Sequence, residues 1–111
     1  MSIKPLIPPV EALVQEELAR ASEQFGGRHH SPHEAYAVML EELQEAQEES
    51  GDAHQMIDLY FYHVKGNSEP KYMQSTLRDL LNHSINAACE FIQLAAMCEK
   101  ALRGYETEDN Q

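Results

Sequence analysis

Two short acidic patterns lie far apart in the chain, and each has the spacing of side chains on one face of a helix. The first is EELQE beginning at Glu41, and the second is EFIQ beginning at Glu90. Because residues three apart point to the same side of a helix, Glu42 pairs with Glu45. Glu90 pairs with Gln93 in the same way. Three carboxylates and one amide oxygen suit Mg²⁺, which prefers oxygen ligands. The simpler interpretation of the same residues is a solvated acidic helix face.

The first pattern falls within a long segment that has a clear helix start. Ser31 can cap this helix, Pro32 fits its first position, and Glu34 completes a capping box. Strong helix formers follow as far as about Lys65. Gly51 interrupts them, but a lone glycine costs only about 1 kcal/mol relative to alanine. We therefore expect one continuous helix.

A turn over residues 66–70, with the sequence GNSEP, separates this helix from the last one. Ser68 is the expected cap of the last helix, which we predict over residues 69–102 with Gly104 as its stop. The midpoint between the two acidic patterns falls in this turn. If the helices fold back on each other, both patterns lie roughly 35 Å from the turn and face one another.

The remaining segments complete an all-α prediction. Residues 1–8 are predicted to be an irregular N-terminal arm, residues 9–104 a single helical domain and residues 105–111 an acidic mobile tail. Within the domain, a helix over residues 9–25 precedes the long antiparallel helical hairpin. A chain of this length buries only a thin core. We therefore expect a homodimer or homotetramer in which hairpins assemble into a four-helix-type bundle.

Composition narrows the classes of partner and the cellular location. The formal net charge is −11, which argues against binding of nucleic acid because that binding depends on lysine and arginine. No apolar run is long enough to cross a membrane, and the N-terminus lacks the pattern of a secretory signal. Cys89 and Cys98 lie about 13 Å apart on one helix, so we expect free thiols. These features favour a cytoplasmic protein with no membrane partner.

At the acidic patterns the chain resembles the MazG-like all-α nucleotide pyrophosphohydrolases, especially the compact members encoded by phages and prophages. The resemblance covers about residues 25–103 and includes the flanking segments HSPHEAYAVMLEELQEAQEE and CEFIQLAAMCEKAL. It implies a helical oligomer that uses Mg²⁺ to cleave a nucleoside triphosphate to the monophosphate and pyrophosphate. It also implies Glu42, Glu45 and Glu90 as metal ligands. Gln93 stands where the family usually has aspartate, and a neutral amide removes one charge from the site.

For the other residues of the predicted site, the sequence is compatible with more than one role. Either Glu41 or Glu49 is a candidate general base, and the sequence does not choose between them. Lys100 lies two helical turns beyond Gln93, where it would reach a phosphate or, more simply, complement the dipole of a helix C-terminus. Arg28 is a second candidate for steering the substrate phosphates.

The sequence also contains a cluster of histidines near the start of the second helix. His29, His30 and His33 crowd the loop before the second helix, where they could bind a phosphate or a transition metal, but histidines at this spacing are common by chance and we expect them to face solvent. His83 is expected on a helix surface or packed against a neighbour. The alternative function is a non-catalytic MazG-fold module that binds a nucleotide or a protein. It is favoured by Gln93, which stands in place of the aspartate usual in the family. A helical adaptor with a merely solvated acidic face is the third hypothesis.

Overall fold

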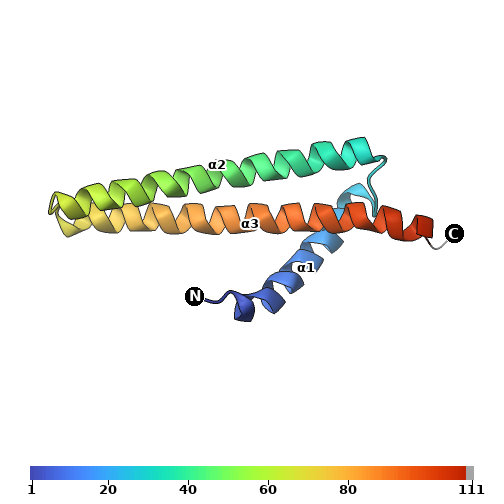
Figure 1. Ribbon diagram of the computed structural model, residues 1–111, viewed down its shortest axis with the longest axis horizontal. Helices are drawn as coiled ribbons and strands as arrows, with labels where there is room; N and C mark the ends of the chain where they lie inside the picture. Colours follow the sequence, from blue (N-terminus) through green and yellow to red (C-terminus); the bar gives the residue numbers. More distant parts are fainter. Residues whose placement is uncertain (110–111) are drawn as a thin grey trace. The chain divides into compact units, whose positions relative to one another are not determined.

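The computed structural model describes residues 1–109, with side chains as far as residue 106. A 3₁₀ turn, η1, covers Lys4–Leu6, and three α-helices follow (Figure 1). They are α1 over Ile7–Phe25, α2 over Pro32–Lys65 and α3 over Pro70–Asp109. The predicted all-α class is confirmed over the described residues. Within that same range, no helix combines the length and the apolar composition needed to span a lipid bilayer.

The N-terminal arm is shorter than predicted. Its last two residues, Ile7 and Pro8, already belong to α1, and η1 orders part of what precedes them. Prolines are tolerated in the first turn of a helix because the missing N–H has no acceptor there. The helix ends at Gly26, whose φ of 89° is readily adopted by glycine.

The start and the length of α2 agree with the sequence analysis. Ser31 Oγ accepts a hydrogen bond from the backbone N–H of Glu34 at 3.1 Å, as a capping box requires. The helix then runs without interruption through Gly51 to Lys65. The prediction of one continuous helix is confirmed.

The turn after α2 is closed by backbone hydrogen bonds. Asn67 adopts a left-handed φ of 50°. Its N–H donates to the carbonyl of Val64 at 3.3 Å, and the N–H of Ser68 donates to the carbonyl of His63 at 3.0 Å. This pair of bonds is a Schellman motif with asparagine at the left-handed position. The predicted side-chain cap is wrong, because Ser68 Oγ pairs with His63 Nδ1 at 2.9 Å and α3 begins only at Pro70.

The C-terminal end of α3 also differs from the prediction. The helix continues past Gly104 to Asp109, so Gly104 does not stop it. A lone glycine without a left-handed conformation costs too little to end a helix of this length. Of the predicted tail, residues 105–109 are therefore helical, and residues 110–111 lie outside the described residues.

The chain divides into two compact units, and the first contains residues 1–43 and 91–111. Its core forms where α1 packs on the C-terminal half of α3. Val14 and Leu18 of α1 are buried with Ala96 of α3, and Ile92 and Met97 pack against this cluster. Leu18 is 1% exposed, so this contact anchors α1 to the first unit.

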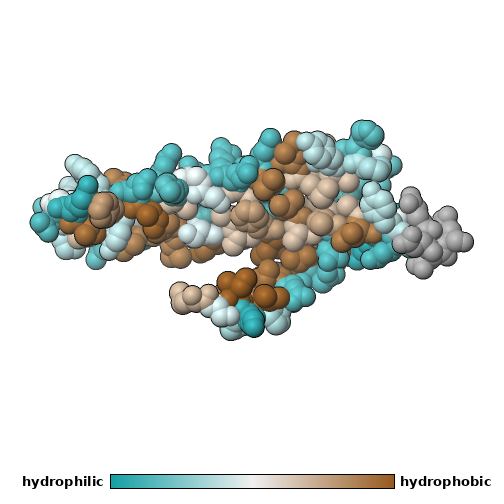
Figure 2. Space-filling view, viewed as in Figure 1, coloured by the Kyte–Doolittle hydropathy of each residue, from teal (hydrophilic) through white to brown (hydrophobic). Residues whose placement is uncertain are grey.

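The second unit, Gln44–Glu90, is an antiparallel hairpin made of the end of α2 and the start of α3. Ala46 and Thr76 are buried in it. Many of its larger apolar side chains are not, and Figure 2 shows some of them on the visible face. Those at least 39% exposed include Ile57, Leu59, Phe61, Val64, Leu77, Leu81 and Ile85. The hairpin therefore buries only part of its apolar surface by itself.

Candidate functional site

Two of the predicted metal ligands meet in the second unit. Carboxylate oxygens of Glu45 on α2 and Glu90 on α3 lie within 4.8 Å of one another. Glu45 is exposed and Glu90 is half-buried. The Schellman turn at Asn67 sets this alignment, because it folds the two helices back at the midpoint between the acidic patterns. The hairpin therefore brings these two carboxylates together as the register predicted.

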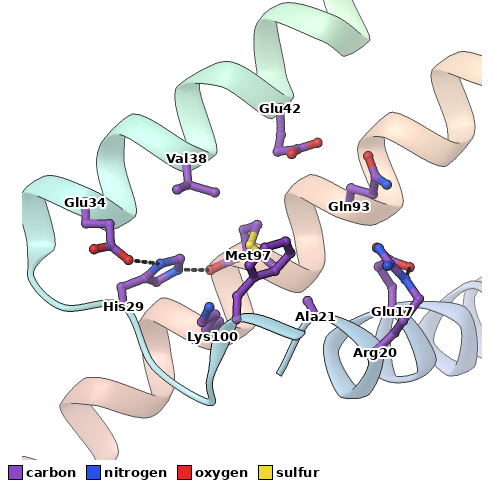
Figure 3. A pocket seen from close by; sticks show the side chains of 11 residues that line it. Glu17, Arg20, Ala21, His29, Glu34, Val38, Glu42, Gln93, Met97 and Lys100 are labelled. Atoms are coloured by element: carbon purple, nitrogen blue, oxygen red, sulfur yellow. Dashed lines mark hydrogen bonds and ion pairs between the residues drawn. The ribbon is translucent and has the colours of Figure 1, made fainter. Parts of the chain in front are cut away.

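The other two predicted ligands, Glu42 and Gln93, belong to the first unit, where they line a pocket of about 320 Å³ (Figure 3). Residues of α1 that sequence reasoning missed stand beside them. Arg20 donates two hydrogen bonds to Glu17, one of them from Nε at 3.0 Å. The Gln93 side chain also hydrogen-bonds to Glu17. The only sequence signal for the pair of Glu17 and Arg20 was their spacing of three residues on one helix.

These contacts determine the charge of this wall of the pocket. The hydrogen bond from Arg20 lowers the pKa of Glu17, and its effect exceeds the opposing effect of partial burial. The same hydrogen bond raises the pKa of Arg20. Glu17 and Arg20 therefore form an ion pair beside the pocket, and the side chain of Gln93 is hydrogen-bonded to the same carboxylate.

Lys100 is the buried cation of the pocket. The residue is only 4% exposed, and no ion pair with a carboxylate joins it among the described residues. The alternative that it complements a helix C-terminus is wrong, because α3 continues to Asp109 and carries no basic residue in its last turn. An ammonium group donates hydrogen bonds to oxygen, so Lys100 is a candidate donor to a ligand in the pocket.

His29 lies on another wall of the pocket, and the expectation that it faces solvent is wrong. Its side chain is 4% exposed. The ring atom Nε2 lies 3.4 Å from the carbonyl oxygen of Met97. The other ring nitrogen, Nδ1, is buried without a hydrogen-bond partner among the described residues, and lies 3.8 Å from Glu34 Oε1 (Figure 3). The cause is the packing of the loop onto α3, a contact between residues far apart in the chain.

A second group of ligand-type side chains occurs in the second unit. His83 Nδ1 lies 2.8 Å from Glu49 Oε2 and 3.9 Å from Asp52 Oδ2. The hydrogen bond with Glu49 is the main reason that the pKa of His83 is raised. All three side chains are partly exposed. Glu49, one of the two candidate bases, is therefore occupied by an ion pair with His83 in this structure.

The last two predicted site residues lie outside these groups. Glu41 is exposed on α2, and Arg28 is exposed in the loop before that helix. Neither Glu41 nor Arg28 is among the described residues that line the pocket. Their predicted roles as base and phosphate ligand gain no geometric support.

Comparison of the chain with known proteins found no matching family model, no matching curated protein and no matching solved structure. A pair of facing carboxylates suits a divalent cation. A pocket with a buried lysine and a buried histidine suits a polar ligand that supplies both acceptors and donors.

Proposed function

We propose that this protein is a MazG-like, Mg²⁺-dependent nucleoside triphosphate pyrophosphohydrolase, which releases the monophosphate and pyrophosphate. The observation that supports the proposal is the meeting of Glu45 and Glu90, within 4.8 Å, on antiparallel helices. Two carboxylates at this separation repel one another. A divalent cation with oxygen ligands removes the repulsion, and Mg²⁺ in such a site keeps coordination positions for phosphate oxygens.

Each carboxylate of the pair has a second oxygen-bearing residue one helical turn away along its own helix. Glu42 precedes Glu45 by one helical turn on α2, and Gln93 follows Glu90 by one turn on α3. Both offer further oxygen ligands. Bound Mg²⁺ would neutralise phosphate charge and position an attacking water. In the pocket of the first unit, Lys100 would donate a hydrogen bond to an oxygen of the bound ligand.

The alternative is a non-catalytic module that binds a nucleotide or a protein. It is favoured by Gln93, whose amide brings no negative charge and is hydrogen-bonded to Glu17. A site with one carboxylate fewer binds Mg²⁺ more weakly. Stabilisation by Mg²⁺ and nucleotide without pyrophosphate release would support this alternative over hydrolysis.

The test is pyrophosphate release from a panel of canonical and modified nucleoside triphosphates, with and without Mg²⁺. Release that requires Mg²⁺ is expected from the wild-type chain. Glu45→Gln and Glu90→Gln should each lower it by at least a hundredfold, because each removes a ligand charge. Glu48→Gln is the matched control, since Glu48 is exposed on the same helix and belongs to none of the groups described above. Equal loss in all three variants, or release without Mg²⁺, would contradict the proposal.

We also propose that the hairpin is the assembly surface of a homodimer or homotetramer. Phe61 is 59% exposed and Leu81 is 58% exposed in the second unit. Contact with a hairpin from another copy would give these apolar side chains a core of four helices. A four-helix-type bundle is thus the assembly that the exposed apolar residues favour.

A further inference from the structure

The imidazole of His29 has its two nitrogens in different environments. A carbonyl oxygen only accepts hydrogen bonds, so the contact of Nε2 with the carbonyl of Met97 at 3.4 Å places a hydrogen on Nε2. With that hydrogen on Nε2, an imidazole that carries one N–H has the lone pair on Nδ1, which is then an acceptor. This atom is buried and has no hydrogen-bond partner among the described residues. A buried polar atom without a partner is costly, which points to a ligand that supplies a donor.

A second acceptor stands beside the first. Glu34 Oε1 lies 3.8 Å from His29 Nδ1, which is too long for a hydrogen bond between the two side chains. Glu34 is 38% exposed and its side chain points to the ring (Figure 3). The backbone N–H of Glu34 is already bound to Ser31, so the position of this residue is set by the helix start. An amino group has two N–H donors and can give one to each acceptor.

The rest of the pocket adds a donor and apolar walls. Lys100 is buried and has an ammonium group that donates to oxygen. It lies seven residues beyond Gln93, about 10 Å along α3, and therefore away from the end that contains Glu42. Val38 and Met97 give the pocket apolar side chains suited to the face of a planar ring. The volume of about 320 Å³ is at the lower end of small-molecule sites.

We propose that this pocket binds a nucleobase that carries an exocyclic amino group and a ring carbonyl, namely cytosine or guanine. His29 Nδ1 and Glu34 accept from the amino group, and Lys100 donates to the carbonyl oxygen. This inference deepens the proposed function and rests on it for the nucleotide nature of the ligand. Uracil, thymine and hypoxanthine lack the amino group, and their single ring N–H beside the carbonyl can satisfy only one of the two acceptors.

The test compares nucleosides that differ at the amino group, by calorimetric titration without Mg²⁺. Guanosine and inosine differ only by the 2-amino group, and cytidine and uridine differ at C4, where cytidine has an amino group and uridine a carbonyl. At least one pair should show a preference of about tenfold or more for the amino-bearing member, the size expected for one buried polar group left unpaired. Equal affinities within both pairs, or no binding of any nucleoside at millimolar concentration, would overturn the inference.

Variants assign the preference to the two acceptors. His29→Leu should reduce it to less than about threefold, and His30→Leu is the matched control because His30 is the exposed neighbour in the same loop. Glu34→Met serves as the second variant. It keeps the backbone bond to Ser31, so the helix start survives while the carboxylate is lost. An unchanged preference in both folded variants would show that another part of the chain makes the selection.

The same experiment separates this inference from the proposed function. Nucleoside binding requires neither Mg²⁺ nor pyrophosphate release. Amino-group selection without hydrolysis would sustain the base site and reject catalysis. Mg²⁺-dependent hydrolysis of all triphosphates at equal rates, without nucleoside selection, would sustain catalysis and reject the base site.

Discussion

Replacement of Glu45 by glutamine should have opposite effects on stability with and without Mg²⁺. The carboxylate oxygens of Glu45 and Glu90 lie within 4.8 Å. At this separation two unit charges repel by about 0.9 kcal/mol in a dielectric like water and by about 3.5 kcal/mol at an effective dielectric constant of 20. Glu45 is exposed, so the lower figure applies. Glu45→Gln should therefore stabilise the metal-free protein by about 1 kcal/mol, or about 4–8 °C in Tm.

When Mg²⁺ is added, the wild type should become more stable than Glu45→Gln. A ligand at a hundred times its Kd stabilises the folded state by about 2.7 kcal/mol. The wild-type chain gains this increment in Mg²⁺, whereas Glu45→Gln loses most of it with the ligand charge. The melting curve of the variant should thus lie above that of the wild type in chelator and below it in saturating Mg²⁺.

Thermal unfolding followed by circular dichroism at low ionic strength measures both effects. Added monovalent salt should reduce the rise in Tm that Glu45→Gln shows in chelator, because salt screens exposed charges. Glu48→Gln removes one negative charge from an exposed site and corrects for the general repulsion of a chain with net charge −11. The reasoning is refuted if Glu48→Gln reproduces the gain in chelator, or if Mg²⁺ stabilises the wild type and Glu45→Gln equally.

Two further outcomes are expected. The raised pKa of His83 means that its ion pair with Glu49 adds stability fully below about pH 6.5, and that this contribution is lost as pH rises through the folded-state pKa. His83→Gln should therefore lower Tm more at about pH 6 than at about pH 8, and an equal loss at both would contradict the assignment. Sedimentation velocity should show a dimer or tetramer whose Kd rises at least tenfold in Leu81→Gln, since 58% of Leu81 is exposed in one chain. A monomer at micromolar concentration would contradict the proposed assembly.

Local signals in the sequence were enough to predict the helices and the carboxylate pair. The Ser31 cap begins α2, Gly51 leaves the helix intact, and the turn at Asn67 reverses the chain. Each of these features depends on hydrogen bonds between residues at most five apart. Helix geometry then carries the register from the turn to Glu45 and Glu90, so their meeting followed from counting residues. The end of α3 was mispredicted, because one glycine is a weak signal at a helix end.

Contacts across the fold decided the environments of the histidines and of Lys100. His83 meets Glu49 over a separation of 34 residues, and His29 meets the carbonyl of Met97 over 68. His29 was predicted to face solvent because closely spaced histidines in a loop are common by chance, but packing against α3 buries its side chain. Lys100 is buried as well, although lysine is a residue type that usually faces solvent. Which side chains are buried, and which atoms then lack a partner, depends on the surfaces that meet in three dimensions, and a single helix or loop does not contain that information.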